Sequence, residues 1–578
     1  MSEPRFNWTL AFLLLLACSV AYVNTLDGQW VWDDASSVLL HRHVQQPGQL
    51  AQLFREDQHA FGRGQGNFYR PLVAASFMMD YALSGGPRPD EYDPRTLPEV
   101  SPFLFHITNM LWHFLAALLF LALLHRLGAP RFVKAAAPLL FAVHPLHTEA
   151  VAYISGRADM MSAVSIFAAL CFAVSAIRLQ RPIGGTIGAA CCFIGGLLSK
   201  ESTLIYPVLL AVMFVMLTTI TREREDAAAA NVENPRLWRL APLVSSLVIL
   251  VVYLVLRTTV LRFAEGGAAV ASPLFQRLVE TLQSLGLYAQ LLFVPVNLHM
   301  ERTLDNVSPA YALGGALFLA LLVVAIVVAW RRGGPHNKRI ALGFAWFLAA
   351  WAPISGVFPL NAPLAEHWMY VPMAGFWWAL LEMLWRLCNS APARRRAAVA
   401  AVFLLCIVFT AMTAQRNRDW NNNERLFRAT LKQNPNTTRV HHNLAVTYDN
   451  LKGNYAGARR HYERYLELRA QERAATGAEQ GIFTGDDIEA RLSLGRVLLQ
   501  SGEYVEAVNV LAPLKQLAEV DAWRPAAAMA AAQTGQALLA LGDIVQAHLY
   551  FDEAITIQPE LTSEIEAILS GMPLYDGY

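Results

Sequence analysis

The chain has 578 residues, of which 55% are hydrophobic and only 16% are charged, and its formal net charge is +1. Soluble globular proteins carry roughly a quarter charged residues, so this deficit predicts a protein that is largely surrounded by lipid. The near-neutral charge argues against a nucleic-acid partner. The six cysteines lie in or beside apolar stretches, in the spacing of neither a disulfide framework nor a zinc site.

Eleven apolar segments approach the ~20 residues that a membrane-spanning helix needs. In chain order they are residues 8–26, 103–124, 135–151, 160–177, 183–198, 204–220, 240–256, 311–330, 340–358, 368–387 and 397–412. Only Arg5 precedes the first segment, which has no small-residue cleavage site, so we interpret it as an anchor and not as a signal peptide. Two further stretches, 68–83 and 274–298, contain charged residues and fit interfacial or re-entrant helices better.

Arginine and lysine concentrate in alternate connections between these segments. The basic connections are residues 126–134, 178–181, 222–239, 331–339 and 386–396. The positive-inside rule places such loops in the cytoplasm, together with the N-terminus. Residues 27–101 and 258–308 then form two large extracytoplasmic loops, and eleven crossings place the C-terminal part on that side as well.

The composition changes after residue 414, where a loose helical repeat begins. Gly453, Gly502 and Gly542 are each followed by alanine five positions later and by a large apolar residue nine positions later. This pattern resembles the tetratricopeptide repeat, although an unrelated helical bundle stays open as an alternative. The sequence therefore predicts a membrane domain over residues 1–414 and an extracytoplasmic α-solenoid over residues 415–578.

Ionisable residues inside membrane spans cost about 2.5–3.5 kcal/mol each at mid-bilayer, so their presence points to function. In the predicted topology, nearly all such residues lie at the extracytoplasmic face. With their polar neighbours they are Asp33, Asp34, Arg70, His106, Asn109, His113, His144, His147, Glu149, Arg157, Asp159, Lys200, Glu201, Glu366, His367 and Tyr370. Taken singly, an aspartate pair is as often a helix cap, a terminal Lys or Arg a headgroup anchor, and a buried histidine a link between helices. Their convergence is the strongest functional signal in the sequence.

A metal site is a further alternative, because His144, His147 and Glu149 are residue types that bind zinc. Pro145 disrupts the helix between them, however, and the chain lacks an HExxH-like spacing there. The pattern therefore does not favour a divalent metal ion.

Six motifs, in this order, resemble the transmembrane and tetratricopeptide-repeat O-mannosyltransferases and their bacterial relatives. They are WVWDD at 30–34, YRPL at 69–72, HITN at 106–109 with His113 after it, HPLHTEAVAYISGRAD at 144–159, SKE at 199–201 and AEHWMYVP at 365–372. The resemblance covers nearly the whole chain, with His367 where the family often has arginine. It implies an all-α, polytopic membrane fold of the GT-C class of glycosyltransferases.

The resemblance also implies a sugar donor, carrying mannose or another hexose on a polyprenyl phosphate, and a hydroxyl acceptor on the extracytoplasmic side. An acceptor hydroxyl needs a carboxylate to take its proton, and we expect Asp33 to do so while Asp34 orients the acceptor. We expect the other residues of the set to surround the donor, with Arg70, Arg157 and Lys200 stabilising the leaving phosphate without a metal cofactor. One base and a phosphate leaving group predict inversion at the sugar carbon.

Three other functions fit parts of the pattern: a transporter of lipid-linked glycan, a noncatalytic scaffold, and a transferase acting on lipid or glycan. Transporters bind their substrates near mid-bilayer, whereas these residues gather at one face. A scaffold leaves the charges unexplained. A repeat domain commonly binds extended peptides, which favours Ser or Thr of a polypeptide as the acceptor. We expect a bacterial inner membrane with a periplasmic site, or an endoplasmic reticulum membrane with a lumenal site if the chain is eukaryotic.

Overall fold

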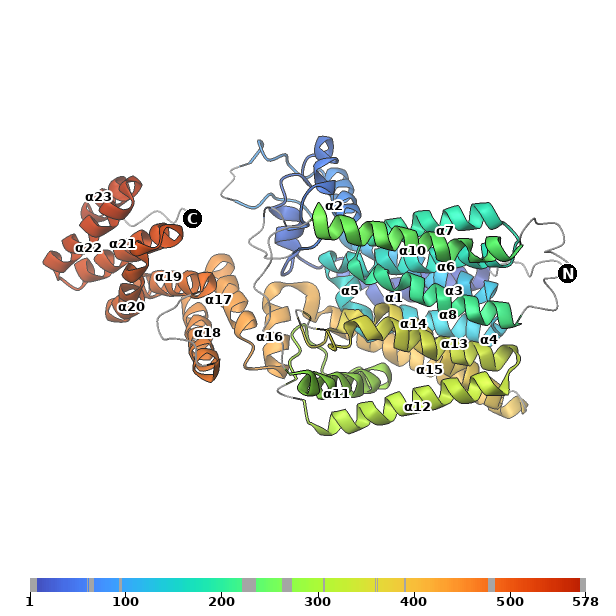
Figure 1. Ribbon diagram of the computed structural model, residues 1–578. Coiled ribbons are helices and arrows are strands. Elements are labelled where there is room, and N and C mark those ends of the chain that lie inside the picture. Colours follow the sequence, from blue (N-terminus) through green and yellow to red (C-terminus); the bar gives the residue numbers. More distant parts are fainter. Residues whose placement is uncertain are drawn as a thin grey trace. The chain divides into compact units, whose positions relative to one another are not determined.

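The computed structural model describes residues 8–59, 61, 67–92, 96–220, 235–261, 273–304, 307–358, 360, 362–388, 391–476 and 484–571. Within these residues the regular elements are helices, and the one extended pairing is an isolated bridge between Arg302 and Leu364. The chain divides into two compact units, Met1–Asn422 and Asn423–Tyr578 (Figure 1). The predicted all-α class is therefore confirmed.

The first unit, which we call the membrane unit, is a bundle of long helices that run side by side (Figure 1). Its helices are α1 (Trp8–Tyr22), α2 (Pro71–Leu83), α3 (Phe103–Arg126), α4 (Arg131–Val143), α5 (Thr148–Ala152), α6 (Arg157–Ile177), α7 (Pro182–Leu197), α8 (Tyr206–Ile220), α10 (Pro235–Thr259), α11 (Leu274–Phe293), α12 (Ala310–Arg332), α13 (Gly334–Trp351), α14 (Tyr370–Cys388) and α15 (Pro392–Asn417). A helix stands at each of the eleven predicted spans. The two stretches expected to be interfacial or re-entrant contain α2 and α11.

Seven of the described elements are long and apolar enough to cross a membrane. They are Trp8–Thr25, Phe103–Arg126, Ile154–Ile177, Glu201–Thr218, Leu237–Thr259, Ala310–Arg332 and Pro392–Asn417. The protein is therefore a membrane protein. The helices α4, α7, α13 and α14 are shorter or more polar, so the count of eleven spans stays a prediction. Residues 222–234 of one basic connection and residue Arg5 lie outside the described residues.

The core of the membrane unit is built on α6 and α14, most of whose residues are buried, whereas α10 and α12 expose valine and leucine along their length. Small residues bring the central helices together. A Cβ atom on Gly375 of α14 would lie 2.6 Å from the carbonyl oxygen of Gly343 of α13. Glycine at such a crossing lets two backbones approach closely, which is how helices commonly pack in lipid.

The second unit, which we call the repeat unit, is a series of short helices that contact their neighbours in the chain. They are α16 (Asn423–Gln433), α17 (Thr438–Lys452), α18 (Tyr455–Thr476), α19 (Gly485–Gln500), α20 (Tyr504–Leu511), α21 (Arg524–Ala540), α22 (Ile544–Ile557) and α23 (Thr562–Leu569). The pattern of neighbour contacts is that of a solenoid.

The three repeat glycines end the first helix of three helical pairs. Gly453, Gly502 and Gly542 have φ values of +57°, +77° and +84°, a left-handed conformation that glycine adopts without steric cost. The alanine that follows each glycine by five positions is fully buried at the crossing of its pair. The expected helical pairs are present, while their assignment to the tetratricopeptide family stays a prediction.

The boundary between the units lies at Asn422, beyond the predicted boundary at residue 414. The end of α15 and the residues after it are tied to the end of α1 and the segment after it. The Asn417 side chain donates to the Ala21 carbonyl at 2.8 Å, and the Gln29 amide donates to the Asn421 carbonyl at 2.8 Å. Trp420, which lies beyond the predicted boundary, is buried in the membrane unit with 1% of its surface exposed. Tertiary contacts hold these residues where composition alone indicated the repeat domain.

We expect the first loop and the repeat unit to lie on the same side of the membrane, because the basic connections alternate with those that contain them. Cysteines introduced at Leu50 and Val545, both well exposed, provide one reporter in each part. An impermeant maleimide added to intact cells or spheroplasts should label both cysteines or neither. Labelling of one alone would contradict an even number of spans between the two cysteines.

Candidate active site

The central segment, residues 144–159, runs from the end of α4 into the first turn of α6 and is the centre of the polar cluster. It was expected to continue a membrane helix to residue 151, but α4 ends at Val143 because Pro145 cannot continue it. The segment instead forms three short turns, Pro145–His147, Thr148–Ala152 and Ile154–Gly156, before α6 begins at Arg157. Its side chains and carbonyls contact the first loop, α3, the connection after α7, and the segment before α14.

The two aspartates of the first loop have different surroundings. Asp34 is fully buried: its Oδ1 accepts from the amide and the hydroxyl of Ser155 at 2.8 Å, and its Oδ2 accepts from the Val31 amide at 3.0 Å. Asp33 is half-buried, and its carbonyl accepts from the Ser37 amide at 2.9 Å in the local turn. Asp34 thus fixes the loop to the central segment, and Asp33 is the carboxylate of the pair with exposed surface.

Burial raises the pKa of Asp34 to about 7, against the opposing effect of its three hydrogen bonds. The negative charge of neighbouring Asp33 adds to the rise. The carboxyl group of Asp34 therefore changes its charge near neutral pH. Its oxygens accept from protein donors, so Asp34 holds the loop that carries Asp33, while its role in orienting an acceptor stays a prediction.

Trp32, directly before the aspartates, has an unusual backbone conformation with φ of +50°. A left-handed conformation costs a bulky residue on the order of 1–3 kcal/mol and persists only where the surroundings enforce it. Here the indole stacks on the ring of Tyr153, with centroids 5.5 Å apart, and Tyr153 stacks on Trp420 at 5.3 Å. Three aromatic rings from three distant segments therefore support the loop.

Asn109 and Arg157 are buried, are hydrogen-bonded to each other, and connect the central segment to α3. The Asn109 amide donates to the carbonyls of Val151, Tyr153 and Ile154 at 3.0–3.3 Å, and its oxygen accepts from Arg157 Nε at 2.7 Å. Asn109 thereby closes the turns of residues 151–154 onto α3.

The Arg157 side chain has no exposed surface. Its guanidinium also pairs with Asp80 of α2 at 2.6 Å and donates to Ser76 Oγ at 3.1 Å and the Phe105 carbonyl at 3.0 Å. From the sequence, this arginine is expected to stabilise the leaving phosphate of the donor. In the structure, the charged group of Arg157 contacts these buried groups of the protein, as expected for a structural ion pair.

Two cations at the edge of the cluster keep exposed surface. Arg70 pairs with Glu201 at 3.0 Å, and its side chain is 14% exposed. Lys200 pairs with Asp159 at 2.6 Å, and its side chain is 11% exposed. Both pairs join the first loop or α6 to the connection after α7. Arg70 and Lys200 are therefore the predicted phosphate-binding cations that have surface left for a ligand.

The four predicted histidines of α3 and the central segment are buried. His113 donates through Nε2 to the Ala142 carbonyl at 2.9 Å, so its Nδ1 accepts from the Tyr370 hydroxyl at 2.6 Å. His144 donates to the Leu292 carbonyl at 3.1 Å. His106 packs against Gly28, where a Cβ atom would lie 2.9 Å from the imidazole. These rings lock neighbouring segments together, and the geometry gives them no exposed face for a donor.

Neither ring nitrogen of His147 has a hydrogen-bond partner among the described residues. The ring is fully buried and lies 4.3 Å, between centroids, from Tyr370.

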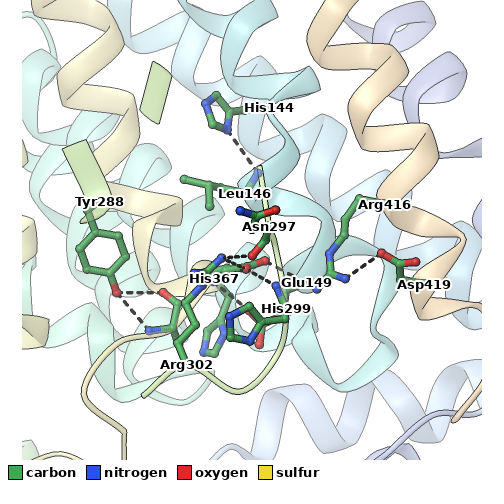
Figure 2. A network of polar contacts seen from close by, with 12 residues as sticks. His144, Leu146, Glu149, Tyr288, Asn297, His299, Arg302, His367, Arg416 and Asp419 are labelled. Atoms are coloured by element: carbon green, nitrogen blue, oxygen red, sulfur yellow. Dashed lines mark hydrogen bonds and ion pairs between the residues drawn. The ribbon is translucent and has the colours of Figure 1, made fainter. Parts of the chain in front are cut away.

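A second polar network surrounds Glu366, which is 1% exposed. Glu366 Oε1 accepts from the His299 amide at 2.7 Å and from Arg302 Nη2 at 2.7 Å, and Arg416 Nη2 lies 3.8 Å from Oε2. Arg416 also pairs with Asp419 at 2.9 Å. In Figure 2, Arg416 and Asp419 lie on one side of the network and Arg302 on the other. Burial, with the two arginines adding to it, lowers the pKa of His299 to about 3, so this imidazole is neutral.

His367 joins this network to the central segment. Its Nδ1 lies 2.9 Å from Glu149 Oε1, and its amide donates to Glu149 Oε2 at 3.2 Å (Figure 2). Glu149, Glu366 and His367 could be identified from the sequence, whereas Arg302 and Arg416 could not. Arg416 lies at the end of the last long helix, where a basic residue is typical of a lipid-headgroup anchor. Arg302 lies in a polar loop. The neighbouring sequence therefore gave no indication that either arginine belongs to the site.

No group of three or more histidine, cysteine, aspartate or glutamate side chains in the described part of the chain is arranged to hold a metal ion. The expectation of a metal-independent site stays a prediction.

Replacement of Arg157 by alanine should destabilise the protein by about 3–5 kcal/mol, because it leaves the Asp80 carboxylate buried without its partner. We expect a large decrease in the midpoint temperature of thermal unfolding in detergent, measured by intrinsic fluorescence. The double variant Asp80→Asn with Arg157→Met should recover part of that loss, since it removes both charges. An Arg157→Ala protein as stable as the wild type would contradict the structural role.

The stability of the protein should depend on the charge of Asp34. Its folded pKa of about 7 lies above its ordinary value of 3.8, so the stabilisation is complete below about pH 4 and is lost as pH rises through 7. Relative to Asp34→Asn, the wild type should therefore lose thermal stability between about pH 4 and pH 7, the interval between the two pKa values. Parallel midpoint–pH curves for the two proteins would contradict this expectation.

Known proteins resemble this chain over most of its length. It is 24% identical to the human "Protein O-mannosyl-transferase TMTC3" over 86% of this chain and 54% of that protein. The Drosophila melanogaster "Protein O-mannosyl-transferase Tmtc3" is 24% identical over 89% of this chain and 59% of its own length. The human "Protein O-mannosyl-transferase TMTC4" is 25% identical over 77% of this chain and 64% of its own length. The chain thus spans little more than half the length of these relatives.

Among solved structures, the apo Archaeoglobus fulgidus oligosaccharyltransferase is 13% identical and covers 80% of this chain and 60% of its own, with a TM-score of 0.38. At this level the GT-C assignment of the membrane unit stays a prediction. No family model matches the chain. The predicted resemblance is nevertheless confirmed: this membrane protein is similar, across its membrane unit and into its repeats, to the protein O-mannosyltransferases of the TMTC group.

Proposed function

We propose that this chain is an integral-membrane glycosyltransferase that moves a hexose from a polyprenyl phosphate to a serine or threonine hydroxyl of a polypeptide. The relatives named as protein O-mannosyltransferases support mannose as the sugar. The observation that carries the proposal is the placement of Asp33, a half-buried carboxylate on a loop that buried contacts hold in position, in a cluster whose edge bears two partly exposed cations.

In this proposal Asp33 is the general base. The acceptor hydroxyl oxygen forms a bond to the anomeric carbon of the sugar while its proton moves to the Asp33 carboxylate. The bond between that carbon and the phosphate oxygen breaks, and its electron pair leaves with the polyprenyl phosphate. Such a base contributes ~10²–10⁴-fold to the rate. Because the acceptor attacks directly, the configuration at the sugar carbon inverts.

The leaving phosphate would be held by Arg70 and Lys200. Both carry positive charge at the ends of α2 and α7, and both retain exposed surface in their ion pairs. Charge-assisted hydrogen bonds from a guanidinium and an ammonium stabilise the negative charge that develops on the departing oxygen. The carboxylates Glu201 and Asp159 hold these cations in place before the donor binds.

The repeat unit would bind the polypeptide acceptor, since stacked helical pairs present extended surfaces of the kind that take peptides. The donor and acceptor would meet on the extracytoplasmic side, in the periplasm of a bacterium or the lumen of the endoplasmic reticulum.

Substituting Asp33 by asparagine should separate chemistry from binding. Asparagine keeps the size of the side chain but cannot take a proton, so turnover should fall by ~10²-fold or more with little change in donor affinity. The measurement is transfer of radiolabelled mannose from polyprenyl-phosphate mannose to a serine- and threonine-rich peptide by the purified protein. Wild-type turnover in Asp33→Asn would remove this residue from the mechanism.

Substituting Lys200 or Arg70 by alanine should raise the KM for the lipid-linked donor, by about 10-fold for each lost charge-assisted bond of ~1.5 kcal/mol. The folded state should be less affected than by Arg157→Ala, because both residues lie at the partly exposed edge of the cluster. Lys432, exposed on α16 in the repeat unit, gives a matched control as Lys432→Ala. Unchanged KM values in both site variants would contradict a role in donor binding and would indicate that Arg70 and Lys200 are lipid-headgroup anchors.

A further inference from the structure

The three aromatic rings beside Asp33 form a graded stack. Trp420 is 1% exposed and Tyr153 is 8% exposed, while Trp32 is half-buried. The planes of Trp32 and Tyr153 differ by 19°, and those of Tyr153 and Trp420 by 30°. The stack therefore begins in the core and ends at an indole that keeps part of its surface exposed.

Trp32 and Asp33 are held by the same short piece of the central segment. Tyr153 supports the indole, and two residues later Ser155 donates twice to Asp34. Since these anchors flank Asp33 on both sides, the indole and the candidate base cannot move independently. The left-handed backbone of Trp32 is part of this arrangement, and such strain is retained where a specific placement matters.

Trp30, in the same motif, shows what a purely structural tryptophan looks like here. Its indole nitrogen donates to the Val100 carbonyl at 3.0 Å, and its ring packs edge-on against Phe105 at 4.9 Å. Trp30 is not among the described residues that have positive φ without being glycine, which are Trp32, Leu179 and Asn297. The two tryptophans therefore differ in backbone, packing and neighbourhood, although both are half-buried.

We propose, on the basis of the proposed function, that Trp32 is a sugar-binding platform that stacks against the pyranose ring of the transferred hexose. A pyranose presents faces of C–H groups and a rim of hydroxyl groups. The C–H face packs on an aromatic ring, and the rim bonds to polar groups. A rigid indole next to a carboxylate provides the first contact and fixes the distance from the sugar to Asp33. Aromatic rings in ligand sites commonly combine with a few placed polar groups in this way.

The test compares two lipids that differ only in the sugar: a polyprenyl phosphate and the same lipid carrying mannose. Their Kd values for the full-length protein in detergent give the affinity gain due to the sugar. The variant Trp32→Asn removes the ring but tolerates a left-handed backbone, and Trp32→Gly replaces it if the asparagine protein does not fold. Trp30→Phe is the matched control.

We expect both Trp32 variants to lose about 3- to 10-fold of the sugar-dependent gain, as one lost aromatic contact implies, with the Kd of the bare lipid unchanged within about twofold. The KM for the mannosylated donor should rise by a similar factor, while Trp30→Phe keeps the wild-type gain. An unchanged gain in both variants, or an equal loss for both lipids, would overturn the platform. If the wild type transfers no mannose at all, the proposed function itself fails, which a separate transfer assay on the wild type reveals.

Discussion

A guanidinium group without exposed surface stands at the start of α6, and the polar end of the membrane unit is arranged around it. Removing such a charge from water costs several kcal/mol unless it is paired and hydrogen-bonded. Arg157 meets this requirement through Asp80, Asn109 and two further acceptors, all of which belong to α2 and α3. The hydrogen bonds and the ion pair that this buried charge requires therefore join α2, α3 and α6 at the candidate site.

The same requirement shapes the rest of the cluster. Each cation that the structure places there has a carboxylate within 3 Å, and the pairs are Arg70–Glu201, Arg157–Asp80, Lys200–Asp159, Arg302–Glu366 and Arg416–Asp419. Neutral pairs are cheaper to keep in surroundings of low polarity than single charges. The pairs differ mainly in exposure, and exposure is what separates groups that can meet a ligand from groups that hold the protein together.

The positions of the helices could be predicted from sequence, because the length of an apolar run and the placement of charges are local properties. The polar end of the bundle could be found for the same reason. The role of each residue in the cluster could not be predicted from the sequence. Arg70 and Arg157 look alike in sequence, and they differ only in how α2 packs on α3 and α6. Arg302 and Arg416 reach Glu366 through tertiary structure alone. The strained backbone of Trp32 likewise depends on Tyr153 and Trp420, which are far away in the chain.

The contacts of Trp420 and Asn421 have a consequence for where the protein can be divided. A cut after residue 414, where the composition changes, would remove the innermost ring of the aromatic stack and the carbonyl that accepts from Gln29. It would also remove Arg416 and Asp419 from the network around Glu366. The last residues before the repeats thus belong to the architecture of the site as much as to the linker. The shortest piece of chain that preserves the candidate active site therefore runs to Asn422.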